Sequence, residues 1–196
     1  MSWVDAVITF WFGNPTAQAP EAEFRQRWFK KSGDFDREIG EQFGDLHTAL
    51  MAGEHATWLE TGLGCLARVL VLDQFSRNMF RNEPAAFASD ALALATTDHV
   101  LEQGSLLGLS PDGQCFLLMP LMHAEDRDRQ AQSVAQFTAL AERAPEQPGL
   151  AANVDYAHRH KKIVDRFGRY PHRNEVLGRA SSPEELEFLK QPGSGF

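Results

Sequence analysis

The sequence predicts an all-α fold, with about eight or nine helices joined by short connections. Apolar residues recur every three or four positions along most of the chain, which is the spacing of one helix face. No stretch of five or more residues alternates polar and apolar side chains as a strand would. The chain has 196 residues, of which 43% are hydrophobic, so we expect a single helical domain over residues 1–190 and a frayed tail over 191–196.

Three helices are expected in the first third of the chain. Ser2 is a suitable cap for the first helix, and Gly13-Asn14-Pro15 ends it. A short helix over residues 21–30 presents aromatic side chains. A longer helix begins at Asp34, its expected cap, and ends near Gly53. The apolar positions of the first helix follow the i, i+3, i+4, i+7 pattern: Val4, Val7, Ile8 and Trp11.

The segment 63–75 is apolar on nearly every side, which is typical of a central, buried helix. Asp73 nevertheless lies on its apolar stripe. A buried carboxylate must be paired or protonated. Arg77 follows four residues later and is the nearest partner along the chain, so we expect these two side chains to form an ion pair.

Further helices are expected in the second half of the chain. Residues 90–103 form one that Gly104 ends, and Ser110-Pro111-Asp112 is a strong start for the next. Pro120 should kink or restart that helix. Three more helices complete the fold: residues 129–143, residues 155–167, and a last helix opened by the capping box Ser182-Pro183-Glu184-Glu185.

The composition is typical of a reduced, cytoplasmic protein. A net charge of -8 disfavours broad nucleic-acid binding. The two cysteines, Cys65 and Cys115, lie far apart and outside any CxxC motif, so we interpret both as small apolar residues. No signal peptide is evident, and no apolar run approaches the roughly 18 residues that a membrane span needs.

Residues 155–179 form a basic island in this acidic chain, with seven basic and three acidic residues. Within it, the segment 169–174 places two arginines and a histidine around an aromatic residue. Arginine suits carboxylate or phosphate, and histidine can transfer protons near neutral pH. Two interpretations stay open: a site for a small anion, or arginines that pair with buried acids such as Asp73 and Glu125. The candidate residues here are Arg169, His172, Arg173 and Asn174.

Two more polar groups are candidate sites. One follows the buried helix, and the other follows Pro120. His158 is a further candidate ligand-binding residue, whereas His160 lies on an apolar stripe and is interpreted as a core histidine bonded to a neighbour. We expect no metal, because there is no HExxH motif and two histidines two positions apart point to different helix faces. The residues of the two groups are Asp73, Gln74, Arg77 and Asn78, and His123 and Glu125.

Several motifs together resemble a bacterial family known as domain of unknown function 924. They are Trp28-Phe29, LDQFSRNMFR over residues 72–81, PLMHAED over 120–126, and FGRYPHRNEVLGR over 167–179, followed by Ser-Ser-Pro-Glu-Glu. The resemblance runs from about Val4 to Leu189. It implies an all-helical fold similar to tetratricopeptide-repeat proteins, an α-α superhelix, and it brings no established activity.

The sequence therefore favours a polar pocket that binds a small anionic molecule. Arg77, Arg169 and Arg173 would hold the anion. His123 and His172 are the candidate catalytic acids or bases if hydrolytic or phosphoryl chemistry follows. No Gly-rich phosphate loop is present, and no cofactor is expected. The alternative is a non-catalytic scaffold that binds a peptide or protein in a groove lined by aromatic residues, among them Trp3, Trp11, Trp28 and Trp58.

Overall fold

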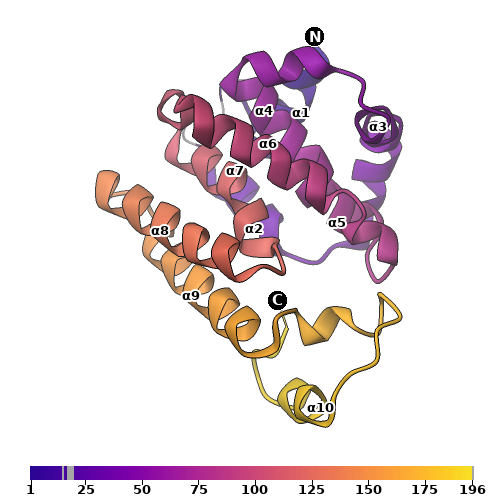
Figure 1. Ribbon diagram of the computed structural model, residues 1–196. Helices are drawn as coiled ribbons and strands as arrows, with labels where there is room; N and C mark the ends of the chain where they lie inside the picture. Colours follow the sequence, from indigo (N-terminus) through magenta and orange to yellow (C-terminus); the bar gives the residue numbers. More distant parts are fainter. Residues whose placement is uncertain (15, 17–19, 196) are drawn as a thin grey trace. The chain divides into compact units, whose positions relative to one another are not determined.

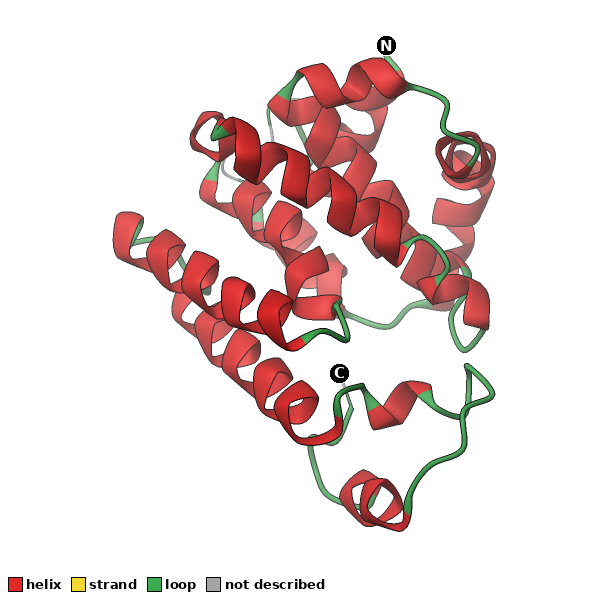
Figure 2. Ribbon diagram, viewed as in Figure 1, coloured by secondary structure: helices red, strands yellow, loops and turns green. Residues whose placement is uncertain are grey.

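The computed structural model describes residues 1–14, 16 and 20–195, without the side chains of Ser105 and Leu107. Helices and loops make up this described part, with no strand in it (Figures 1 and 2). The all-α prediction is therefore confirmed. The chain divides into two compact units: the first comprises Met1–Arg81 and Ala85–Pro120, and the second comprises Asn82–Pro84 and Leu121–Phe196. That the units form one domain stays a prediction.

Nearly every helix predicted from the sequence is present. Those that lie in the first unit are α1 (Trp3–Phe12), α2 (Ala22–Phe29), α3 (Gly33–Met51), α4 (Gly62–Val69), the π-helix η2 (Leu70–Phe75), α5 (Ser76–Met79) and α6 (Asp90–Gln103). Helix α7 (Pro111–His123) crosses into the second unit at Pro120. The second unit also contains α8 (Arg127–Arg143), α9 (Leu150–Phe167), the short 3-10 helix η5 (Pro171–Arg173) and α10 (Pro183–Leu189).

Serine side chains cap the N-termini of three of these helices. Ser2 and Ser182 each form a capping box with the acid three residues later, as predicted for Ser182. The expected cap of α3, Asp34, was wrong: the hydroxyl of Ser32 accepts the bond from the amide of Phe35. The serine is favoured because it lies one residue before the first helical position, where an oxygen can reach the free amides. Pro15 of the predicted stop after α1 lies outside the described residues.

An aromatic cluster forms the core of the first unit. Phe75 is fully buried, and its ring centroid lies 4.9 Å from that of Phe43 and 5.5 Å from that of Trp11. Phe116 of α7 stands edge-on to the ring of Trp11, with centroids 5.5 Å apart. The edge-to-face geometry adds to the burial energy of these large side chains. The central position of 63–75 predicted from its apolar composition is thus confirmed.

The central helix contains a π-helical segment that the sequence did not predict. The amide of Ser76 donates to the carbonyl of Val71, five residues earlier instead of four. Two neighbouring carbonyls accept side-chain donors. The hydroxyl of Ser89 donates to the carbonyl of Leu72, and Nη1 of Arg77 donates to the carbonyl of Asp73 at 2.9 Å. These side chains hold the wider turn in place, since a buried carbonyl needs a donor.

Helix α7 is continuous through Pro120, so a restart of the helix at this residue was wrong. Proline removes a single amide donor from the helix ladder. The flanking residues Leu117 and Leu118 are fully buried. Packing therefore compensates for one missing hydrogen bond, and the helix continues to His123.

In the second unit, α8 and α9 lie side by side as a helical hairpin (Figures 1 and 2). Phe137 of α8 and Val164 of α9 are buried within it. Gly168 ends α9 in the left-handed conformation, with φ of 72°. The chain then turns into η5, and Tyr170, which immediately precedes η5, is fully buried against Ile163 and Val164.

Candidate functional site

The first predicted group surrounds the π-helical segment of the first unit. Asp73 is fully buried, and its Oδ1 lies 2.9 Å from Nη1 of Arg77, so the expected ion pair is confirmed. The same nitrogen lies 3.0 Å from Oδ1 of Asp90, a partner that the sequence did not indicate. Arg77 therefore neutralises two carboxylates and also bonds the carbonyl of Asp73. Removing Arg77 would therefore leave a buried charge without its partner, which is costly.

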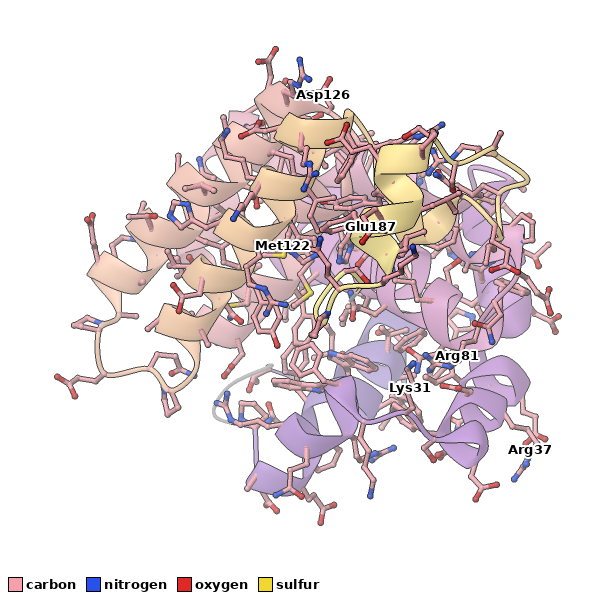
Figure 3. All side chains as sticks on the ribbon, turned by 90° about the horizontal axis from the view of Figure 1, so that it is seen from below. Lys31, Arg37, Arg81, Met122, Asp126 and Glu187 are labelled. Atoms are coloured by element: carbon pink, nitrogen blue, oxygen red, sulfur yellow. The ribbon has the colours of Figure 1, made fainter. Side chains whose placement is uncertain are left out.

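The two amides of this group point to different neighbours. Gln74 donates to the carboxylate of Asp73 and to Sδ of Met119. Asn78 donates to Oδ1 of Asp36 on α3 at 2.7 Å. Arg81, which is labelled in Figure 3, donates to both carboxylate oxygens of Asp36. Burial would raise the pKa of Asp36, but the hydrogen bonds from Arg81 and Asn78 bring that pKa below its ordinary value. Asn78 thus joins α5 to α3.

The second unit brings together histidines from three segments, two of which lie against one tyrosine. His123 ends α7, His160 lies on α9, and His172 and Arg173 lie in η5 next to Tyr170. Ring centroids are 6.3 Å apart for His123 and His160, 5.6 Å for His160 and Tyr170, and 5.5 Å for Tyr170 and His172. The guanidinium of Arg173 lies 4.5 Å from the centroid of the Tyr170 ring. We call these five residues the His–Tyr–Arg cluster.

Tyr170 and Gln130 fix the end of α7, where His123 lies. The hydroxyl of Tyr170 donates to the carbonyl of Met122 at 2.6 Å and accepts from Nε2 of Gln130 at 2.8 Å. Gln130 also donates to the carbonyls of Met122 and Ala124, each at 2.7 Å. The last carbonyls of a helix have no partner within it. These two buried side chains supply the donors and so position His123.

Glu125 holds the segment that follows α9. Nη1 and Nη2 of Arg179 bind its two oxygens, and the amide of Tyr170 donates to Oε1 at 2.7 Å. Burial would raise the pKa of Glu125, but these bonds lower it below its ordinary value. Asn174 accepts from Nε of Arg179 at 3.0 Å and donates to Ser181. Glu125 and Asn174 therefore shape the loop that carries the cluster.

Two rings of the cluster are held neutral. Burial, and then the neighbouring His123, lower the pKa of His160 to about 3. Burial, and then the charge of Arg173, lower the pKa of His172 to about 4. Nδ1 of His160 lies 2.8 Å from the carbonyl of Tyr156, so this nitrogen carries the proton and Nε2 is the acceptor. The predicted bond of His160 to a neighbour is confirmed.

Two further predicted residues, Arg169 and His158, also lie outside the cluster. Arg169 forms two hydrogen bonds to the carboxylate of Glu185, at 2.7 and 2.8 Å, and joins α9 to α10. The hydrogen bond from Arg169 lowers the pKa of Glu185 to about 2. His158 is exposed on α9, whereas His160 is buried. Two positions along a helix correspond to opposite faces, so the two histidines diverge as the spacing implies.

The composition of the cluster argues for hydrogen bonding and charge more than for metal ligation. Across residues 1–14, 16 and 20–195, no group of three or more His, Cys, Asp or Glu side chains is placed to hold a metal ion. The carboxylates near the cluster are bound by arginines, as Glu125 is by Arg179. The chemical groups of the cluster itself are one guanidinium, three imidazoles and one phenol.

Sequence reasoning missed several residues of this site. Tyr170 was noted only as the aromatic residue between two arginines, and Gln130 lay in a segment considered only for its amphipathic pattern. His160 was expected in the core, which is correct, but its closeness to His123 depends on how α7 and α9 meet. Arg179 belongs to the basic island, and only the fold reveals its pairing with Glu125.

A groove of about 370 Å³ lies in the first unit, beside the start of α3, and contains none of the predicted site residues. Its charged side chains are partly paired, with Nη2 of Arg27 3.8 Å from Oε2 of Glu38. Its lining residues are Arg27, Lys30, Ser32, Asp34, Phe35 and Glu38.

The four tryptophans of the scaffold alternative do not share one exposed surface. Trp11 and Trp58 are buried, at 1% and 8% exposure. Trp28 donates from Nε1 to the carbonyl of Trp11 and stacks on its ring. Trp3 is the exposed one, at 46%. Two of the four indoles are therefore unavailable to a partner.

The fold and the cluster define an all-helical protein in which three histidines, one tyrosine and one arginine gather in the second unit. The chain belongs to the family described as bacterial protein of unknown function (DUF924), which matches residues 7–193. It is similar to the structure of a protein of unknown function, ATU0120, from Agrobacterium tumefaciens, with 33% sequence identity and a TM-score of 0.80. That alignment covers 95% of this chain and 96% of the other. Among curated proteins, none matches this chain.

No described helix combines the length and the apolar character that a membrane crossing requires. The longest helix, α3, has 19 residues and carries acidic side chains in its first turn. The family membership and this observation leave the activity open, so the function is argued from the site.

Proposed function

We propose that the protein binds a small anion at the His–Tyr–Arg cluster of the second unit. The observation that carries the proposal is the gathering of Arg173, His160 and His172 around the ring of Tyr170, with His123 next to His160. A guanidinium offers a planar set of donors that matches carboxylate or phosphate. Imidazole rings around it add hydrogen-bonding groups without adding acidic side chains.

The electrostatic potential within the cluster supports an anion. The charge of Arg173 contributes to the low pKa of both His160 and His172. Burial accounts for most of these shifts and disfavours any charge, whereas the part that comes from Arg173 disfavours a second cation and favours an anion. Glu125 opposes this effect at His172, but Arg179, which binds Glu125, adds to it.

The proposal narrows the set of arginines that would hold the anion. Arg77 and Arg169 lie within 3 Å of carboxylates that they help to bury or position. Arg179 does the same for Glu125. Of the three arginines predicted to hold the anion, Arg173 is the one that belongs to the cluster. We therefore give it the central role in anion binding.

A reaction at this site could not use His172 as a ready proton donor. A ring with a pKa near 4, as for His172, is unprotonated at neutral pH and is a poor proton donor. Hydrolytic or phosphoryl chemistry, with His123 or His172 as the base, is thus a secondary proposal that depends on binding. Its test is turnover of a phosphorylated or ester substrate by the unmodified protein.

The binding proposal is tested by calorimetry and thermal unfolding with inorganic phosphate, phosphorylated metabolites and carboxylates. A ligand at about 100 times its dissociation constant should stabilise the fold by roughly 2.7 kcal/mol. We expect Arg173→Ala to abolish this effect. Arg166→Ala is the matched control, because it removes the same charge from an exposed pair with Glu184 in the same unit. Equal anion binding by Arg173→Ala and the native chain would refute the proposal.

The scaffold alternative has less support. Trp3 and Phe29 are exposed, at 46% and 69%, and could contact a peptide. Trp11 and Trp58 are buried, so the aromatic groove that this alternative requires would lack half of its indoles. We therefore place the alternative second.

A further inference from the structure

The end of the described chain folds back onto the His–Tyr–Arg cluster. A Cβ added to Gly195 would lie 3.6 Å from Cβ and 3.7 Å from Cγ of His172. The backbone of Ser194 acts on the ring of His172 as a hydrogen-bond partner that raises the pKa of the ring, against the larger effect of burial. This bond favours the protonated ring, so the ring donates and the carbonyl oxygen accepts. We call residues 192–195 the C-terminal strap.

Two hydrogen bonds and a left-handed glycine give the strap a defined shape. The hydroxyl of Ser194 donates to the carbonyl of Leu189 at 3.1 Å, and its amide donates to the carbonyl of Gln191 at 3.2 Å. Gly193 has a φ of +77°, which side chains rarely adopt, and a Cβ there would lie 3.2 Å from Nη2 of Arg159. The strap thus has a specific turn that ends at the cluster.

We propose that the C-terminal strap is an autoinhibitory contact, in which the carbonyl oxygen of Ser194 takes the place on His172 that an oxygen of the anion would occupy. The inference rests on the proposed function of the cluster. Binding of the anion would then release the strap, and the two would compete for the same ring nitrogen. The strap is suited to this role because it is short, so opening it locally should cost little free energy.

The contact between the C-terminal strap and His172, which should cover the ring, is tested without any ligand. In a chain that ends at Gln191, carbethoxylation of His172 by diethyl pyrocarbonate, followed by mass spectrometry, should be several-fold faster than in the full chain. His158 is the internal control, because it is exposed on α9 and should react equally in both proteins. An unchanged rate at His172, with equal rates at His158, would show that the strap does not cover His172 and would refute the proposal.

Competition is tested with inorganic phosphate as the probe. The truncated chain should bind phosphate roughly three- to tenfold more tightly, the change that releasing one hydrogen bond corresponds to. Gly193→Ala should act in the same direction by straining the turn, with Gly53→Ala as the matched left-handed glycine in the first unit. Equal phosphate affinity of the full and truncated chains refutes competition. Faster labelling of His172 with no phosphate binding by either chain refutes the anion site and the competition but keeps the cover.

Discussion

Tyr170 shows how one side chain can build a helix end and line a site. Its hydroxyl closes the last turn of α7 together with Gln130, and its ring packs between His160, His172 and Arg173. The two functions use different parts of the side chain. A substitution that removes only the hydroxyl therefore separates them.

We expect Tyr170→Phe to reduce the free energy of unfolding by about 1–3 kcal/mol, because it leaves buried groups on Met122 and Gln130 with a lost partner. The ring remains, so the cluster keeps its aromatic centre. Tyr156→Phe is the matched control, since the ring of Tyr156 is 46% exposed and should cost less than about 0.5 kcal/mol. Urea denaturation of both variants measures the difference, and equal costs would contradict this role of the hydroxyl.

Among the elements, the π-helical segment η2 stands out because side chains donate hydrogen bonds to two of its backbone carbonyls. A wider turn is costly unless the carbonyls that it displaces are bonded. Ser89 is the residue that precedes α6, and Arg77 lies in α5. The segment thus depends on contacts from outside the local sequence, which explains why local periodicity did not indicate it.

Replacement of Ser89 by alanine should destabilise the protein by about 1–3 kcal/mol, because the carbonyl of Leu72 would lose its buried donor. Ser133→Ala is a suitable control. Ser133 is also fully buried, and its hydroxyl has no hydrogen-bond partner in the part of the chain that the structure describes. Thermal unfolding should show a clear loss for the first variant and little or none for the second. Similar values for both would contradict a specific role of Ser89.

At the scale of the whole molecule, the basic island is largely an internal framework. Arg166 pairs with Glu184, Arg169 with Glu185 and Arg179 with Glu125, all within the second unit. Of the two interpretations that the sequence left open, pairing with acids describes these arginines. The acids are mostly different from those that the sequence indicated, because the nearest partners in space come from α10 and from the loop after α7.

Acid should destabilise the protein through its buried histidines. The pKa of His160 and of His172 is about 3 and about 4 in the folded chain, against 6.5 ordinarily. The unfolded chain therefore binds more protons between pH 6.5 and 4, and stability falls as pH falls through this window. The loss should be about 1 kcal/mol per pH unit for each ring. Burial also lowers the pKa of His47 in the first unit, which acts in the same sense.

Urea denaturation between pH 8 and 5, together with NMR titration of the imidazole protons, measures this dependence. Stability should be constant above about pH 7 and decline below it. The resonances of His160 and His172 should not titrate above pH 5. Titration of either ring between pH 6 and 7 would contradict the structure around it.

Much of the fold could be predicted because helix starts and apolar stripes are local. The capping box at Ser182 and the bounds of α6 agree with the structure, and so does the ion pair of Asp73 with Arg77. The site was only partly predictable. His123, His172 and Arg173 were identified by residue type, but Tyr170 and Gln130 matter through contacts between α7, α8 and η5, which no single stretch of sequence contains.

The wider turn of η2 also sets the rotational register of everything that follows it in the same helix. Each residue of an α-helix advances the side chains by about 100° around the axis. Deleting one residue within Leu70–Phe75 would restore ordinary helix spacing locally. Because the wider turn takes up that one residue, the deletion should keep Arg77 near Asp90 and Asn78 near Asp36. The wider turn therefore accommodates an extra residue while the contacts beyond it stay in register.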